Sequence, residues 1–349
     1  MEKYYKYIDK LNIEHCLTEH QYAELIKNYS SDLALYAAEK AVIKRKKIYQ
    51  NKVYIRGLIE LSNYCKNDCL YCGIRKSNKS CTRYRLTEKE ILNCCDQGEK
   101  LGFKTFVLQG GEDAYYSDEV LCRIIENIKK RHKSCAVTLS LGERSAKSYE
   151  LLKKAGADRY LLRHETADFE HYKLLHPSEM SFDNRIKCLE ILKSLGYQTG
   201  CGFMVGSPYQ TAQNIAKDLK FIEKFKPDMC GIGPFIPHKC TPFANEKAGS
   251  VELTCFLLSI IRLIKPNILL PATTALGTIH PTGREMGIKA GANVVMPNLS
   301  PLSVRKKYEL YDNKICTDEE SAQCIKCLGK RMESIGYEIA FERGDIIND

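Results

Sequence analysis

The sequence predicts an α/β fold in which eight parallel strands alternate with helices and close into a (β/α)8 barrel of the TIM type. Helical patterns separate short apolar runs, and strands that alternate with helices form parallel sheets. Eight is also the number of strands that closes such a barrel. The apolar runs, mostly flanked by Gly, Pro, Asp or Asn, are 53–61, 104–109, 135–141, 157–162, 198–205, 228–233, 268–272 and 293–296.

The first 50 residues precede the strands and are expected to be helical. Thr18–Gln21 has the sequence of a capping box, and a second helical pattern covers Leu33–Arg45. A further capping box, Thr87–Glu90, is expected to open a helix that runs toward Leu101.

The alternation of strands and helices stops near residue 297, and no linker or internal repeat divides the chain. A length of 349 residues is sufficient for one large α/β barrel. We therefore expect three parts: an N-terminal helical cap at 1–50, the barrel at 51–297, and an irregular C-terminal extension at 298–349.

Composition excludes several classes of protein. Hydrophobic residues make up 44% of the chain, yet no apolar run of about 18 residues is present, so no membrane span is expected. The N-terminus is polar and lacks the apolar core of a secretion signal. Seventeen cysteines in a long chain of this kind indicate a reduced, anaerobic cytoplasm rather than a disulfide framework.

The formal net charge is +10, and the lysines are spread over predicted helix faces without an arginine-rich block. This distribution favours solvated helix surface over a nucleic-acid interface. Part of the positive charge is available for an anionic substrate or a redox partner.

Polar or glycine-rich clusters follow several predicted strands. In a (β/α)8 barrel the C-terminal ends of the strands meet at one mouth, where active sites are built. The clusters are Gln109–Asp113, Ser140, Arg163–Glu165, Met204–Gly206, Thr273–Thr274 and Met296–Asn298.

Three closely spaced cysteines, Cys65, Cys69 and Cys72, form a C-x3-C-x2-C triplet after the first predicted strand. Such thiolates can hold three irons of a [4Fe-4S] cluster and leave the fourth iron open for chemistry. A structural zinc site needs a fourth Cys or His, and the next cysteine, Cys81, lies outside the tight loop. The other alternative is three unrelated cysteines.

The triplet resembles the signature of radical S-adenosylmethionine (SAM) enzymes. In those enzymes the methionine amino and carboxylate groups chelate the fourth iron, and one electron cleaves SAM to a 5'-deoxyadenosyl radical. The resemblance implies catalytic roles for Cys65, Cys69 and Cys72 as cluster ligands. It also suggests that Gly110, Gly111 and Glu112, one βα unit later, hold the methionyl amine, whereas the tripeptide alone would indicate only a tight turn.

Other residues at the predicted mouth can bind polar groups. The Glu165 carboxylate can accept from ribose hydroxyls, and the forks of Arg163 and Arg185 can pair with a carboxylate, although a salt bridge among the three is the alternative. Tyr71 offers an aromatic plane for an adenine or packs in the core. His164 should face away from its neighbours and be structural.

A second three-thiolate array, Cys316, Cys324 and Cys327, lies in the C-terminal extension. It can bind a second [4Fe-4S] or [2Fe-2S] cluster, a zinc ion with an outside ligand, or nothing. The remaining eleven cysteines lack ligand spacing, and we expect them to act as small hydrophobic residues.

After the N-terminal helices, nearly the whole chain resembles the HydE family, the radical SAM maturases of [FeFe]-hydrogenase. LLRHETA, PATTALGT and the C-terminal cysteine array resemble this family more than biotin synthase. The strings that carry the resemblance are SNYCKNDCLYCGIR (62–75), VLQGGEDAYY (107–116), VTLSLGE (137–143), AGADRYLLRHETA (155–167), GIGPFIPH (231–238), PATTALGT (271–278), GANVVMPN (291–298) and KICTDEESAQCIKC (314–327).

The resemblance implies a complete barrel with an internal cavity and a cluster at its top. Ser140, Glu165 and Arg185 would contact SAM, and the C-terminal cysteines would match an accessory cluster that not every member has. Residues matching the substrate cavity are Thr138, Arg163, Thr273, Thr274, Met296, Tyr308 and Tyr311. Departures from the family pattern at Cys201, Tyr209 and Cys240 touch no expected cluster ligand.

The family's role implies a substrate and partners. The substrate would be a cysteine-bound iron carrying CO and cyanide, supplied by HydG, and the product would pass to the scaffold HydF for the diiron site of the H-cluster. A ferredoxin or flavodoxin would supply electrons. Two other functions compete: a radical SAM mutase like methylornithine synthase, and a non-catalytic iron–sulfur carrier.

Overall fold

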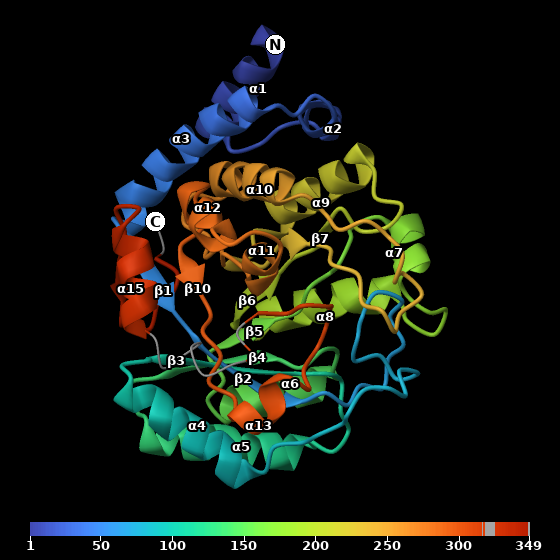
Figure 1. Ribbon diagram of the computed structural model, residues 1–349, viewed down its shortest axis with the longest axis vertical. Coiled ribbons are helices and arrows are strands. Elements are labelled where there is room, and N and C mark those ends of the chain that lie inside the picture. The colour runs from blue at the N-terminus through green and yellow to red at the C-terminus, as the bar shows by residue number, and fades with distance from the viewer. Residues whose placement is uncertain (316, 318–324, 348–349) are drawn as a thin grey trace.

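A ring of parallel β-segments lies at the centre of the molecule, surrounded by helices (Figure 1). The computed structural model describes residues 1–315, 317 and 325–347. The strands are β1 (Lys52–Ile55), β2 (Gly57–Ser62), β3 (Thr105–Gly110), β4 (Ala136–Ser140), β5 (Arg159–Leu161), β6 (Gln198–Cys201), β7 (Met204–Val205), β8 (Met229–Cys230), β9 (Gly233–Pro234), β10 (Val294–Val295) and β11 (Glu338–Ala340).

The ring closes as the sequence predicts. Six strands pair in the order β2-β3-β4-β5-β6-β8, and β10 pairs with β1. The remaining gap is bridged by the segment around 268–271, through Met229 with Leu269 and Pro271 with Val294. Every one of these pairings is parallel, which confirms the (β/α)8 barrel.

Several predicted strands are shorter or interrupted. The run 53–61 is broken at Arg56 into β1 and β2, and 198–205 and 228–233 also divide into two strands each. The run 268–272 forms only isolated bridges. Pro271 has no N–H to donate to a neighbouring strand, which accounts for the weak pairing there.

Beyond residue 50, the helices of the described chain lie in the connections between strands. Thr18 and Thr87 both form the predicted capping boxes. The helices are α1 (Glu2–Glu14), α2 (Glu19–Lys27), α3 (Ser31–Tyr49), α4 (Glu88–Lys100), α5 (Asp118–Arg131), α6 (Ala146–Lys154), α7 (Phe169–Leu175), α8 (Phe182–Ser194), α9 (Ala212–Phe225), α10 (Val251–Ile264), α11 (Thr274–Ile279), α12 (Gly283–Lys289), α13 (Leu302–Arg305) and α15 (Ile325–Glu333).

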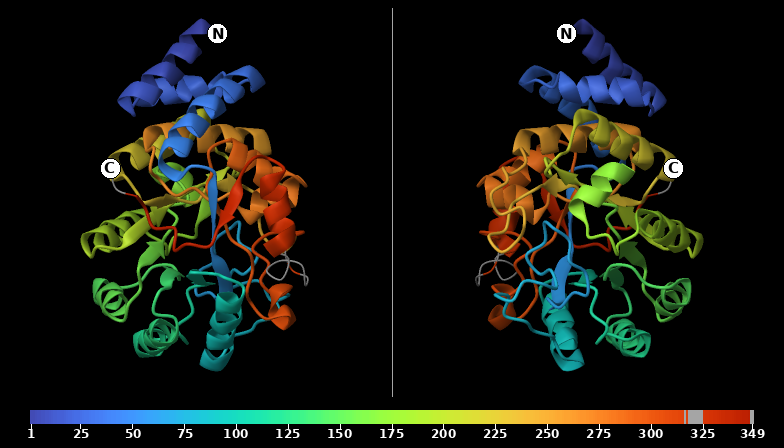
Figure 2. Two further views of the ribbon diagram at one scale, coloured as in Figure 1. Left: turned by 90° about the vertical axis from the view of Figure 1, so that its left-hand side faces the viewer. Right: turned by 90° about the vertical axis from the view of Figure 1, so that its right-hand side faces the viewer.

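The helices α1, α2 and α3 gather at one end of the molecule, outside the ring (Figure 2). There α3 packs against α10, and α2 packs against α9. Among the residues that the structure describes, no helix is both long and apolar enough to cross a membrane.

The C-terminal segment seals the end of the barrel opposite the strands' C-termini. The strand β11 pairs with β1, and the chain then crosses beneath the sheet. Its backbone and side chains bind the buried Arg159, which donates to the Arg343 carbonyl at 2.9 Å and to Asp345 at 2.5 Å. The extension is therefore more regular than predicted, since it contributes α13, α15 and a strand.

Candidate active site

A cavity of about 330 Å³ opens at the C-terminal ends of the strands. Most of the predicted site residues line it, although they come from distant parts of the chain. They are Cys65, Cys69, Tyr71, Cys72, Gly110, Gly111, Glu112, Ser140, Arg163, Glu165, Arg185, Thr273, Thr274, Tyr308 and Tyr311.

Two predicted cavity residues do not line this space. Met296 packs against a cluster of apolar side chains deeper in the barrel. Thr138 lies on β4, two residues before Ser140. Of the C-terminal cysteines, Cys316 and Cys324 lie outside the described residues, and Cys327 is exposed on α15. The second array therefore stays a prediction.

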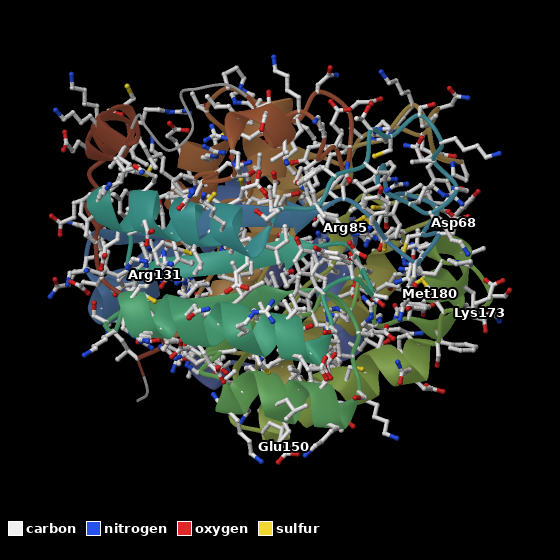
Figure 3. All side chains as sticks on the ribbon, turned by 90° about the horizontal axis from the view of Figure 1, so that it is seen from below. Asp68, Arg85, Arg131, Glu150, Lys173 and Met180 are labelled. Carbon is white, nitrogen blue, oxygen red and sulfur yellow. The ribbon has the colours of Figure 1, made fainter. Side chains whose placement is uncertain are left out.

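The cysteine loop is held in shape by protein groups. The Cys72 N–H donates to the Cys69 carbonyl at 3.3 Å, and Asp68 accepts from Arg75 at 2.7 Å. On its outer side, the Cys69 Sγ lies 3.6 Å from the Met180 Sδ, and Figure 3 shows Asp68 and Met180 on the same side of the molecule. These contacts preorganise the loop for whatever its thiols bind.

The three thiols are half-buried and lie close enough to affect one another. Burial, and to a smaller extent the neighbouring Cys65, raise the pKa of Cys69 to about 12. Burial also raises the pKa of Cys65 and Cys72. Without a cofactor the thiols therefore stay protonated, and binding iron would release protons.

The spacing of the thiols fits a cluster better than a single ion. Among the described residues, no three His, Cys, Asp or Glu side chains are grouped to hold one metal ion. In a [4Fe-4S] cluster each thiolate binds a different iron, so the sulfurs need not converge on one point. The chemistry of the donor set, three thiols at one cavity wall, fits such a cluster.

Glycine brings the end of β3 against the cysteine loop. A Cβ on Gly111 would lie 2.2 Å from the Tyr64 carbonyl oxygen and 2.7 Å from the Cys65 Cβ. The next residue, Glu112, donates its N–H to the Cys65 Sγ at 3.4 Å, and its carboxylate pairs with Lys66 at 3.0 Å. Only glycine permits this close approach.

Arg163 and Glu165 follow β5 and face each other inside the cavity. Arg163 Nη2 lies 3.1 Å from Glu165 Oε2, although neither atom has a hydrogen bond of good geometry. Glu165 also has a positive φ of 66°, which is uncommon for a residue other than glycine. Of the alternative salt bridge among Arg163, Glu165 and Arg185, only the contact between Arg163 and Glu165 is present, and both of these side chains retain unused hydrogen-bonding capacity.

Arg185 is buried at the start of α8 and already has a carboxylate partner that the sequence analysis missed. Its Nε donates to Glu143 Oε1 at 2.5 Å, and its Nη1 donates to the Arg163 carbonyl at 2.7 Å. Asn184 donates to the other Glu143 oxygen at 2.5 Å. Glu143 belongs to the string VTLSLGE, but its role depends on a helix 40 residues away along the chain and is not readable from spacing.

Tyr71 is fixed by a second group that the sequence analysis missed. Its hydroxyl donates to His176 Nε2 at 3.2 Å, because His176 Nδ1 donates to the Tyr172 carbonyl at 2.9 Å. Burial lowers the pKa of His176 to about 3, so the ring is neutral and can accept this bond. His164, in contrast, faces Asp218 of α9 at 3.2 Å, as expected for a structural histidine.

A strap from the C-terminal extension covers one side of the cavity. Gly73 in the cysteine loop donates its N–H to the Leu310 carbonyl at 2.8 Å, and Tyr308 and Tyr311 line the cavity beside it. The strap is anchored by the buried pair of Lys314 and Glu60, 2.5 Å apart.

A closed (β/α)8 barrel with three thiols beside a cavity at its mouth has the architecture of radical SAM enzymes. The model of the radical SAM superfamily matches residues 59–222. The [FeFe] hydrogenase maturase subunit HydE of Thermotoga maritima is 49% identical over 84% of this chain and 83% of its own length. The chain belongs to the HydE family of radical SAM enzymes, which confirms the predicted fold, superfamily and family.

Two further relatives lie in a neighbouring family. The 3-methylornithine synthase of Methanosarcina acetivorans is 31% identical over 87% of this chain and 84% of its own length. A crystal structure of methylornithine synthase superposes with a TM-score of 0.83 at 27% identity, covering 95% of this chain and 97% of the other. The barrel is thus shared with an enzyme that is named for a different reaction.

Proposed function

We propose that this radical SAM hydrogenase maturase processes an iron–cysteine complex carrying CO and cyanide toward the diiron site of the H-cluster. The observation that carries the proposal is a cavity whose polar atoms lack partners in a protein 49% identical to HydE. Two of its lining atoms, Thr273 Oγ1 and Arg163 Nε, are buried without hydrogen bonds among the described residues. A compact anionic complex would satisfy such donors.

The residues at the mouth of the barrel would bind different parts of the cofactors. Cys65, Cys69 and Cys72 would hold a [4Fe-4S] cluster, which with SAM supplies a 5'-deoxyadenosyl radical. Gly110, Gly111 and Glu112 would receive the methionyl amine, and Arg185 the carboxylate. The wall beneath them keeps water and other reactive groups away from the substrate.

The pocket for the nucleoside part of SAM would be completed by three side chains. The Glu165 carboxylate would accept from the ribose hydroxyls, and the Ser140 hydroxyl would accept or donate there. The ring of Tyr71, held by His176, would lie along the adenine. Thr274, Tyr308 and Tyr311 would bound the substrate space, which lies on the barrel side of these groups.

The partners follow from the same function. The substrate would come from HydG, the product would go to HydF, and a ferredoxin or flavodoxin would reduce the cluster in an anaerobic cytoplasm. We retain the division into a cap at 1–50, a barrel at 51–297 and an extension at 298–349, with a second cluster at Cys316, Cys324 and Cys327.

The test is formation of 5'-deoxyadenosine by the anaerobically reconstituted, reduced protein, with and without the cysteine-ligated iron carbonyl–cyanide complex. The complex should stimulate formation strongly, and Cys69→Ala should abolish it. Formation that persists in Cys69→Ala would contradict the cluster assignment, and formation that the complex does not stimulate would contradict the substrate.

A second candidate function is a mutase reaction like that of methylornithine synthase. The barrel's TM-score of 0.83 with that enzyme favours it. Stimulation of SAM cleavage by lysine instead of the iron complex would support the mutase. Absence of any SAM cleavage in fully loaded protein would support a non-catalytic carrier.

A further inference from the structure

Asp218 is a fully buried carboxyl group behind the wall of the candidate active site. It lies on α9, is 0% exposed, and does not line the cavity. Its Oδ1 accepts from the Ala167 N–H at 2.5 Å and lies 3.2 Å from His164 Nε2. Its Oδ2 is buried without a hydrogen bond among the described residues. Burying a carboxyl group with one unpaired oxygen costs stability, so the group needs an explanation beyond packing.

The contacts of His164 fix the position of its proton. Its Nδ1 accepts from the Gly202 N–H at 3.3 Å, so this nitrogen carries no proton. Burial lowers the pKa of His164 to about 3, and the neutral ring therefore has its proton on Nε2, which donates to Asp218. His164 thus connects Gly202, in the bend between β6 and β7, to Asp218 on α9.

Glu165 lies between the two backbone points that Asp218 holds. Its N–H donates to the Gly202 carbonyl at 3.0 Å, and the N–H of the same glycine donates to His164. Two residues after Glu165, the Ala167 N–H donates to Asp218. The φ of 66° at Glu165 is disfavoured for a residue with a side chain, and such a conformation persists only where the surrounding structure holds it.

This backbone conformation sets the direction of the Glu165 side chain. Its carboxylate lines the cavity, with Oε2 at 3.1 Å from Arg163 Nη2. Because φ determines where the Cα–Cβ bond points relative to the preceding strand, a return to negative φ would move the carboxylate from this place. The bonds on either side of Glu165 therefore decide whether the carboxylate stays in the cavity.

We propose that Asp218 is a positioning residue for Glu165. Through His164 on one side and the Ala167 N–H on the other, it holds Glu165 in the left-handed conformation and orients its carboxylate toward the ribose hydroxyls of SAM. One oxygen of Asp218 makes both contacts, which accounts for the unpaired Oδ2. The inference rests on the proposed function in that Glu165 is taken to bind the ribose.

The test compares two ligands of the reconstituted holoprotein by equilibrium dialysis. They are SAM and its 2',3'-dideoxyribose analogue, which lacks the hydroxyls that Glu165 would bind. The wild-type protein should bind the analogue about tenfold more weakly than SAM, because hydrogen bonds to a charged group are strong. In Asp218→Ala the Kd for SAM should rise about fivefold and that for the analogue should not change, so the ratio of the two falls to about two.

Two conservative variants keep most of the packing. Asp218→Asn retains an acceptor oxygen for the Ala167 N–H and His164, and should keep the wild-type ratio of Kd values. His164→Phe retains the ring that packs on Phe221, with centroids 4.7 Å apart, and removes only the nitrogen contacts. It should lower the ratio to about four, since the bond from Ala167 to Asp218 remains.

The matched control is Leu219→Ala, at the next position of α9, where the leucine is 1% exposed. Loss of a buried leucine should lower the Tm, as Asp218→Ala also should. The control should leave both Kd values unchanged, because Leu219 makes no hydrogen bond to the segment around Glu165. A loss of stability alone is thereby separated from a loss of orientation at Glu165.

The outcomes distinguish the role of Asp218 from the proposed function. A wild-type ratio in Asp218→Ala, an equal rise in both Kd values, or the same fall of the ratio in Leu219→Ala would overturn the role of Asp218. So would a loss of the ratio in Asp218→Asn as complete as in Asp218→Ala. If the wild-type holoprotein binds neither ligand, the proposed function fails. If it binds both equally, the ribose contact of Glu165 is wrong, and the role of Asp218 falls with it.

Discussion

Replacing Gly111 by alanine tests whether the approach of β3 to the cysteine loop is essential. The added Cβ would lie 2.2 Å from the Tyr64 carbonyl oxygen, about 1.2 Å short of the 3.4 Å at which ordinary contact begins. The obstructing atoms are the Tyr64 backbone and the Cys65 Cβ, so no flexible side-chain end can move aside. We expect a loss of about 3 kcal/mol of unfolding free energy, the upper part of the range for overpacking.

Function should suffer more than stability. A displacement of about 1 Å at an active site costs about 100-fold in rate, and here the displaced residue is the cluster ligand Cys65. The assay combines urea unfolding of the metal-free protein with 5'-deoxyadenosine formation after reconstitution.

The matched control is Gly329→Ala in α15, where the nearest atom lies 4.0 Å from the added Cβ. It should raise the unfolding free energy by up to about 1 kcal/mol and leave the rate unchanged. A Gly111→Ala protein with normal stability and a rate within twofold of wild type would refute the reasoning.

Three other changes have defined outcomes. Acid should destabilise the protein below pH 6.5, because burial lowers the pKa of His176 to about 3, whereas a histidine in the unfolded chain titrates near 6.5. The contribution of His176 to the unfolding free energy is present above pH 6.5 and falls by about 2 kcal/mol at pH 5; this part of the pH dependence of urea unfolding should be missing in His176→Gln. Lys314→Met leaves the buried Glu60 without its counter-charge and with only the hydrogen bond from Asn298, which should cost about 3–5 kcal/mol in urea unfolding. Adding Glu60→Gln should recover a large part of this loss, and an unchanged midpoint in the single variant would argue against the anchor. Tyr209 has a positive φ of 64° and is 61% exposed, so Tyr209→Gly should raise the unfolding free energy by about 1 kcal/mol, and a fall would show that its ring packs usefully.

The barrel could be predicted from the sequence because its signals are local. Each strand is a short apolar run with turn residues at its ends, and the capping boxes at Thr18 and Thr87 mark helix starts within four residues. The strand that pairs less than predicted also has a local cause. Pro271 removes a donor from the seventh strand, which no count of apolar residues reveals.

Much of the site was predictable from short motifs and from strand ends. Cys65 was found from the spacing of three cysteines, and Gly111 and Glu165 were found because strand ends converge in a barrel. Glu143 and His176 were missed because their roles depend on contacts with Arg185 of α8 and with Tyr71 of the cysteine loop, which lie far from them along the chain. Thr138 was assigned to the substrate cavity by the family resemblance, but it does not line the cavity, because depth along the barrel axis is set by strand stagger, which the sequence does not express.

The pairing of β1 determines when the barrel can form. Tyr54 of β1 pairs with Val294 of β10 and with Ala340 of β11, which both lie far along the chain. During synthesis these partners emerge last, so the sheet remains open while most of the protein is already made. The cysteine loop follows directly after β2 and would wait beside that open edge. Pairing of β10 and β11 with β1 is thus also the step that closes the sheet next to the thiols.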